Sequence, residues 1–159
     1  MSKHPLTRYA VEDLVQVRKI AGKTRSLGVV GELPFLLDIR RVDSPTVDLS
    51  LLFEARTPRH PLPGVPSVKR PSASLMWKGN RIRGIDWTIK HEVVRYGVPT
   101  GEVIRGWHEH YWTDEDDSKS IREPKPLPKN EDMNALIAWC CANWNIEGIQ
   151  KSVGLFDGN

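Results

Sequence analysis

Apolar and polar positions alternate along much of the middle of the chain, which is the period of a half-buried β-strand. The alternation is clearest over residues 47–56, where apolar side chains hold the odd positions. Further stretches with strand character cover residues 35–41, 73–78, 81–90 and 101–112. We expect 35–41 and 47–56 to form a hairpin. We also expect 81–90 to pair antiparallel with 101–112, because the intervening link is short.

Apolar residues recur at helical spacing near both ends of the chain. Residues 8–21 form the first such segment, with Thr7 as a possible N-cap and Gly22 as a stop signal. The second follows Asn130, which is a good N-cap. A short strand is expected from Ile146. The pattern therefore predicts an α+β fold, with an antiparallel sheet of about five strands and an N-terminal and a C-terminal helix packed on it.

Proline and glycine divide these elements without dividing the chain, so residues 1–159 are interpreted as a single domain. Proline-rich loops are expected at 57–72 and 122–129, because proline lacks the N–H that a sheet or helix interior needs. Gly79-Asn80 predicts a two-residue hairpin turn. Residues 91–100 are interpreted as a connection.

Composition excludes several classes of function. The net charge of the 159 residues is only +3, so the protein is not a polycation, although residues 69–105 hold eight Lys or Arg against three Asp or Glu. The cysteines, Cys140 and Cys141, are adjacent, which excludes a disulfide framework and a cysteine zinc site. No apolar run has the length of a signal peptide or a membrane span. We therefore expect a cytoplasmic protein without a membrane partner.

The strongest candidate for chemistry is the stretch 101–112, which contains His108 and His110. Histidines two apart on a strand share one face and can converge on one metal ion, for which His91 and Asp86 are conceivable third ligands. The spacing alone does not justify assigning a metal or a cofactor. The structural alternative is that these histidines are satisfied by neighbours and the nearby tryptophans are core.

Metal-free cleavage of RNA is the hypothesis that uses most of these residues. His108 and His110 would act as an acid–base pair, with His91 in support, because histidine titrates near neutrality. Cationic and aromatic side chains would hold phosphates and stack bases. The residues proposed for nucleic-acid binding are Arg81, Arg83, Arg105, Trp87, Lys69 and Arg70.

The runs Arg81-Ile-Arg-Gly-Ile-Asp86 and Gly106-Trp-His-Glu-His-Tyr-Trp112, with His91 between them, resemble small prokaryotic toxins of TumE-like toxin–antitoxin pairs. The resemblance covers about residues 75–144. It implies a compact toxin that acts on RNA and is neutralised by an antitoxin partner. The sequence therefore predicts a toxin-like, metal-independent ribonuclease. The alternative is a non-catalytic nucleic-acid or protein-binding component of a larger assembly.

Overall fold

The computed structural model describes residues 6–26, 34–56, 63–64 and 69–149. The helices are α1 (Arg8–Gln16) and α2 (Met133–Asn143). The strands are β1 (Lys19–Ser26), β2 (Phe35–Arg41), β3 (Leu49–Arg56), β4 (Arg70–Trp77), β5 (Asn80–Arg95), β6 (Val98–Thr113), β7 (Asp117–Arg122) and β8 (Ile146–Glu147).

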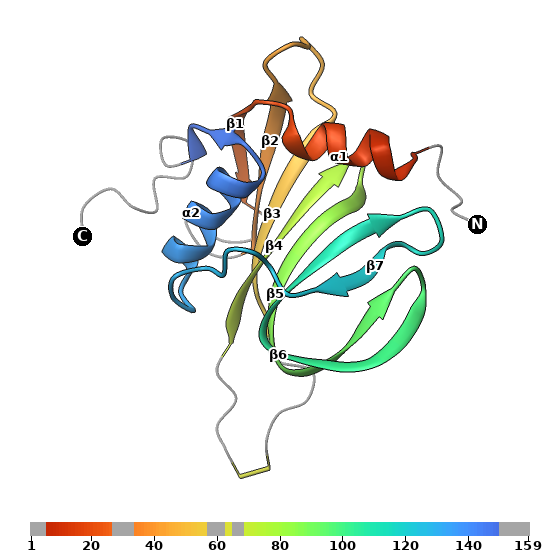
Figure 1. Ribbon diagram of the computed structural model, residues 1–159. Helices are drawn as coiled ribbons and strands as arrows, with labels where there is room; N and C mark the ends of the chain where they lie inside the picture. Colours follow the sequence, from red (N-terminus) through yellow and green to blue (C-terminus); the bar gives the residue numbers. More distant parts are fainter. Residues whose placement is uncertain (1–5, 27–33, 57–62, 65–68, 150–159) are drawn as a thin grey trace.

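Within the described residues, the eight strands form one sheet in the order β7-β6-β5-β4-β3-β2-β1-β8, which curls strongly at β5, β6 and β7 (Figure 1). Neighbouring strands are antiparallel except β1 and β8, which are parallel. Both helices pack on one face, here called the helix face, which carries the fully buried Leu51, Leu75 and Ile85 (Figure 1). The opposite face carries Ser74 and Asp86 and is here called the histidine face.

The prediction of about five strands is wrong, because β1, β7 and β8 extend the sheet to eight strands in the part of the chain that the structure describes. Strand β1 begins within the segment predicted as helix: α1 ends at Gln16 and Val17 is already extended. Strand β7 lacks the apolar alternation that identifies a half-buried strand. Its inward positions include Ser118 and Ser120, which are too polar to stand out in a hydrophobicity pattern.

Several local predictions are confirmed with small shifts. Strand β2 has the predicted bounds, and β2–β3 and β5–β6 are antiparallel pairs as expected. Thr7 caps α1 by accepting from the Ala10 amide at 3.2 Å. Asp132 rather than Asn130 caps α2, accepting from the Ala135 amide at 2.8 Å. The short strand expected from Ile146 is β8.

Both predicted connections around β5 are displaced. The turn before β5 is Lys78-Gly79, whose φ angles of 47° and 80° are positive, rather than Gly79-Asn80. The expected link at residues 91–100 is mostly strand, because β5 and β6 continue to a tight turn at Tyr96-Gly97. The loop prediction at 57–72 lies mostly outside the described residues, and β4 already begins at Arg70.

The side chain of Lys19 is fully buried where β1 meets both helices. Its Nζ donates to the carbonyls of Val15, Val17 and Trp144 at 2.6, 2.7 and 2.6 Å. Burial lowers the pKa of Lys19 to about 7. These bonds satisfy carbonyls at the C-terminal ends of α1 and α2, which have no partner within a helix.

Candidate functional site

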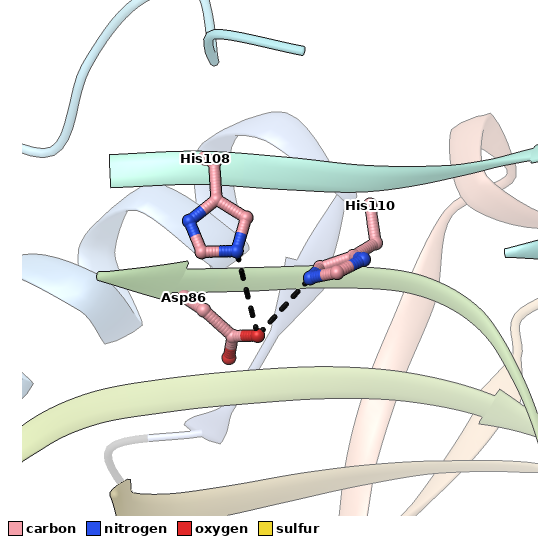
Figure 2. Close-up of side chains that lie close together, drawn as sticks. All are labelled: Asp86, His108 and His110. Atoms are coloured by element: carbon pink, nitrogen blue, oxygen red, sulfur yellow. Dashed lines mark hydrogen bonds and ion pairs between the residues drawn. The ribbon is translucent and has the colours of Figure 1, made fainter. Parts of the chain in front are cut away.

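A buried cluster of two histidines and one carboxylate lies on the histidine face, where β5 pairs with β6. His108 is the cross-strand partner of Asp86. His110 is the partner of Gly84, which lies two residues before Asp86 on the same strand. Side chains two apart on a strand share a face, so the predicted His-x-His arrangement and the cross-strand register place all three side chains together. Figure 2 shows them converging from the two strands.

Both imidazoles direct Nε2 at the same oxygen of Asp86. The distance from His110 Nε2 to Asp86 Oδ2 is 3.1 Å, and that from His108 Nε2 is 3.8 Å (Figure 2). Each of the three residues offers one atom that could ligate a metal, and these three atoms lie within 4.8 Å of one another. The ring centroids of His108 and His110 are 4.9 Å apart.

Burial keeps both imidazoles uncharged. His108 is 3% exposed and His110 is 9% exposed. Burial, followed by repulsion from His110, lowers the pKa of His108 to about 3, although the Asp86 charge opposes the shift. Burial also lowers the pKa of His110, with its hydrogen bond to Asp86 acting against it. At neutral pH, His108 therefore presents a neutral ring to the carboxylate.

Arg81 approaches the cluster from the other side of His110. Its Nη2 lies 3.4 Å from His110 Nδ1, and its guanidinium donates to Ser118 Oγ at 3.2 Å and to the Ser118 carbonyl at 3.3 Å. Because guanidinium can only donate, Nδ1 must accept, so the proton of neutral His110 is on Nε2 and faces Asp86. Both nitrogens of His110 are therefore engaged.

His91, the third predicted catalytic residue, adjoins the same cluster. Its ring centroid lies 5.1 Å from that of His108 and 6.5 Å from that of His110. Its Nδ1 donates to the carbonyl of Glu92 at 2.9 Å. The structure therefore brings all three predicted histidines together. Asp86, which the sequence offered only as a conceivable ligand, lies between His108 and His110.

Arg81 and Arg83 are two positions apart and would share one face of a regular strand, but the structure places them on opposite faces of β5. Arg81 is opposite Met76 whereas Arg83 is opposite Leu75, so three residues of β5 face two of β4 and the alternation shifts at this bulge. Arg83 lies on the helix face, 1% exposed, where it pairs with Glu12 of α1 and lies 3.9 Å from Glu109. It is buried in an ion-pair network away from the histidines.

The remaining residues predicted to bind nucleic acid do not gather at the histidines. Trp87 donates from Nε1 to Glu131 at 2.9 Å, and the Arg70 guanidinium stacks 4.6 Å from the Trp87 ring and pairs with Glu131 at 2.5 Å. Trp87 is opposite Trp107, on the helix face. Lys69 and Arg105 are exposed.

No protein-family model matches the chain, and no curated protein or solved structure is detectably similar to it. The TumE-like resemblance therefore stays a prediction. Among the described residues, neither helix has the length and apolar character needed to cross a membrane. The geometry of the site is therefore the basis for inferring a function.

Proposed function

We propose that this protein binds one divalent transition-metal ion, with Zn²⁺ as the first candidate, through Asp86, His108 and His110. The observation that carries the proposal is the convergence of two imidazole Nε2 atoms on one carboxylate oxygen, with donor atoms within 4.8 Å of one another. Two histidines and a carboxylate are a recurrent donor set for Zn²⁺ and for non-haem Fe²⁺.

The burial of the cluster favours a metal over a free acid–base pair. A metal ligand must offer a lone pair, and the lowered pKa of His108 keeps its ring unprotonated without help from the ion. The same lowering, to about 3, leaves His108 at neutral pH without the protonated imidazolium form that a general acid requires. His110 has both nitrogens engaged. Metal-free catalysis by this pair thus remains a prediction with less support.

Loading the site requires one rearrangement. When His110 Nε2 binds the ion, its proton moves to Nδ1, and the contact with Arg81 is lost because both groups are then donors. Arg81 keeps its two bonds to Ser118, so its side chain stays anchored. Three protein ligands leave a coordination position for water, as in catalytic zinc sites, where the ion lowers the pKa of the bound water.

Isothermal titration of chelator-stripped protein with Zn²⁺ tests the proposal. We expect one ion per chain for the wild type and at least a tenfold loss of affinity for Asp86→Asn and for His108→Gln. Asp43→Asn is the matched control, because Asp43 is an exposed carboxylate outside the cluster. Equal affinity of Asp86→Asn and the wild type would refute the ligand assignment.

The second candidate function is cleavage of RNA, with RNA as the substrate of this metal centre. The position of Arg81 is the observation that favours this function. Its guanidinium lies beside His110, where it could hold a phosphate. A groove of about 850 Å³ lies between the β5–β6 hairpin and β7, and it supports RNA binding less than Arg81 does. It is lined by Arg95, Arg122 and Lys125 but also by Glu102, Glu109 and Glu123, so its charges balance.

Incubation of labelled single-stranded RNA with stripped and Zn²⁺-loaded protein separates the alternatives. Cleavage only by the loaded protein supports a metal-dependent ribonuclease. Equal cleavage in chelator supports the metal-free mechanism that the sequence predicts. Binding without cleavage points to the non-catalytic alternative. The antitoxin partner stays a prediction, tested by co-purification with the product of a neighbouring reading frame.

A further inference from the structure

We infer that His91 is a fourth ligand of the metal centre and closes its coordination sphere, an inference that rests on the proposed binding of an ion by Asp86, His108 and His110. Three features of His91 support this role: the strand irregularity that turns it toward the cluster, the hydrogen bond on its other nitrogen, and the spacing of the rings.

The first feature is the position of His91 in the strand. Asp86 and His91 are five residues apart, so on a regular strand they would point to opposite faces. Between Thr88 and His91, however, four residues of β5 lie opposite three of β6, because Thr88 pairs with Gly106 and His91 with Ile104. The extra residue reverses the alternation and directs His91 to the face of His108. Gly106, opposite this bulge, has a φ of 88°, a conformation that favours glycine.

The second feature is the hydrogen bond from His91 Nδ1 to the Glu92 carbonyl, at 2.9 Å. A carbonyl only accepts, so Nδ1 carries the proton and, in the neutral ring, Nε2 carries the lone pair. Histidines that ligate metals characteristically donate their other ring N–H to a carbonyl or carboxylate, which fixes the tautomer and the ring orientation. His91 has this arrangement before any ion binds.

The third feature is the distance between rings. Two imidazoles that bind one tetrahedral ion have centroids roughly 5 Å apart, because the Zn–N distance is about 2.0–2.1 Å. The separations of 4.9 Å for His108–His110 and 5.1 Å for His91–His108 agree with this value. The His91–His110 separation of 6.5 Å is longer, so binding requires the two rings to approach each other by roughly 1.5 Å. Adjacent register shifts in β5, on either side of His91, give the backbone a place to adjust.

The chemical consequence is that His91 decides whether the centre is closed or open. With His91 bound, the ion has four protein ligands, as in structural zinc sites. With His91 withdrawn, the fourth position is open to water or substrate. His91 is also the least buried of the three histidines, so it is the ligand that an incoming group can displace.

Cobalt substitution tests this inference, because tetrahedral Co²⁺ absorbs visible light far more strongly than five- or six-coordinate Co²⁺. Stripped wild-type protein, His91→Ala and His91→Cys are titrated with Co²⁺. Lys90→Ala is the matched control, since Lys90 is the exposed neighbour on the same strand. We expect strong tetrahedral bands for the wild type and Lys90→Ala. His91→Ala should bind at least tenfold more weakly and lose intensity. His91→Cys should recover it and add a thiolate-to-cobalt charge-transfer band.

The results distinguish this inference from the proposed function. If the wild type and His91→Ala bind Co²⁺ with the same affinity and spectrum, or if His91→Cys binds without a charge-transfer band, His91 is not a ligand although the centre exists. If the wild type binds no Co²⁺ at all, the metal centre itself is refuted. Because His91→Cys gives a positive signal, poor folding of His91→Ala leaves the inference testable.

Discussion

The uncharged state of His108 predicts that acid destabilises the folded protein in part through this residue. Burial lowers the pKa of His108 to about 3 in the folded state, whereas the unfolded chain has the ordinary value of about 6.5. Between these two pKa values, the unfolded chain binds more protons at His108 than the folded protein does. The stability that depends on neutral His108 is therefore fully present above pH 6.5. It is lost progressively as the pH falls toward 3.

The magnitude follows from the two pKa values. At pH 5.0 the solution is about 1.5 units below the unfolded pKa, and each unit corresponds to about 1.4 kcal/mol, so His108 lowers the free energy of unfolding by about 2 kcal/mol. Replacing His108 by glutamine removes the titrating group and keeps a polar side chain of similar reach.

Urea denaturation at pH 7.5 and pH 5.0, in chelator to exclude metal ions, measures this effect. The wild type should lose about 2 kcal/mol more than His108→Gln between the two pH values, because groups outside the cluster contribute equally in the two proteins. If the two proteins lose the same free energy of unfolding, His108 is not held neutral by burial, and the electrostatic description of the cluster is wrong.

Three further substitutions separate the roles of buried cations. Lys19→Met removes the donor to three helix-end carbonyls, and should lower the free energy of unfolding in urea by about 3 kcal/mol. Arg83→Met removes the partner of Glu12, whereas Glu109 keeps its pair with Arg122, so the substitution should cost about 1–3 kcal/mol in the same assay while the folded fraction binds Zn²⁺ normally. Arg81→Met should instead tighten Zn²⁺ binding about tenfold by calorimetry, because a like charge beside His110 is removed. Weaker Zn²⁺ binding by Arg81→Met would contradict the rearrangement described for His110.

Alternation along the sequence was sufficient to predict the His-x-His strand, and the short link between the two strands was sufficient to predict its pairing with β5. Alternation placed His108 and His110 on one face because both lie in a regular part of β6, where counting by two holds. The same counting failed for Arg83, because the bulge at Arg81–Arg83 adds one residue to β5 and reverses the faces beyond it.

The other failures concern partners that are distant in the chain. Buried cations look like surface residues in a sequence, and the buried Arg83 pairs with Glu12 of α1, which is 71 residues away in the chain. Lys19 is similarly held by Trp144, 125 residues away. Strand β7 was missed because serines fill positions where a hydrophobicity pattern requires apolar residues.

The most direct test of the metal centre is a crystal structure of the Zn²⁺-loaded protein with anomalous diffraction measured at the zinc absorption edge. One anomalous peak is expected, at about 2.0–2.2 Å from Nε2 of His108, Nε2 of His110 and a carboxylate oxygen of Asp86. A peak bound elsewhere on the chain, or none between β5 and β6, would contradict the account.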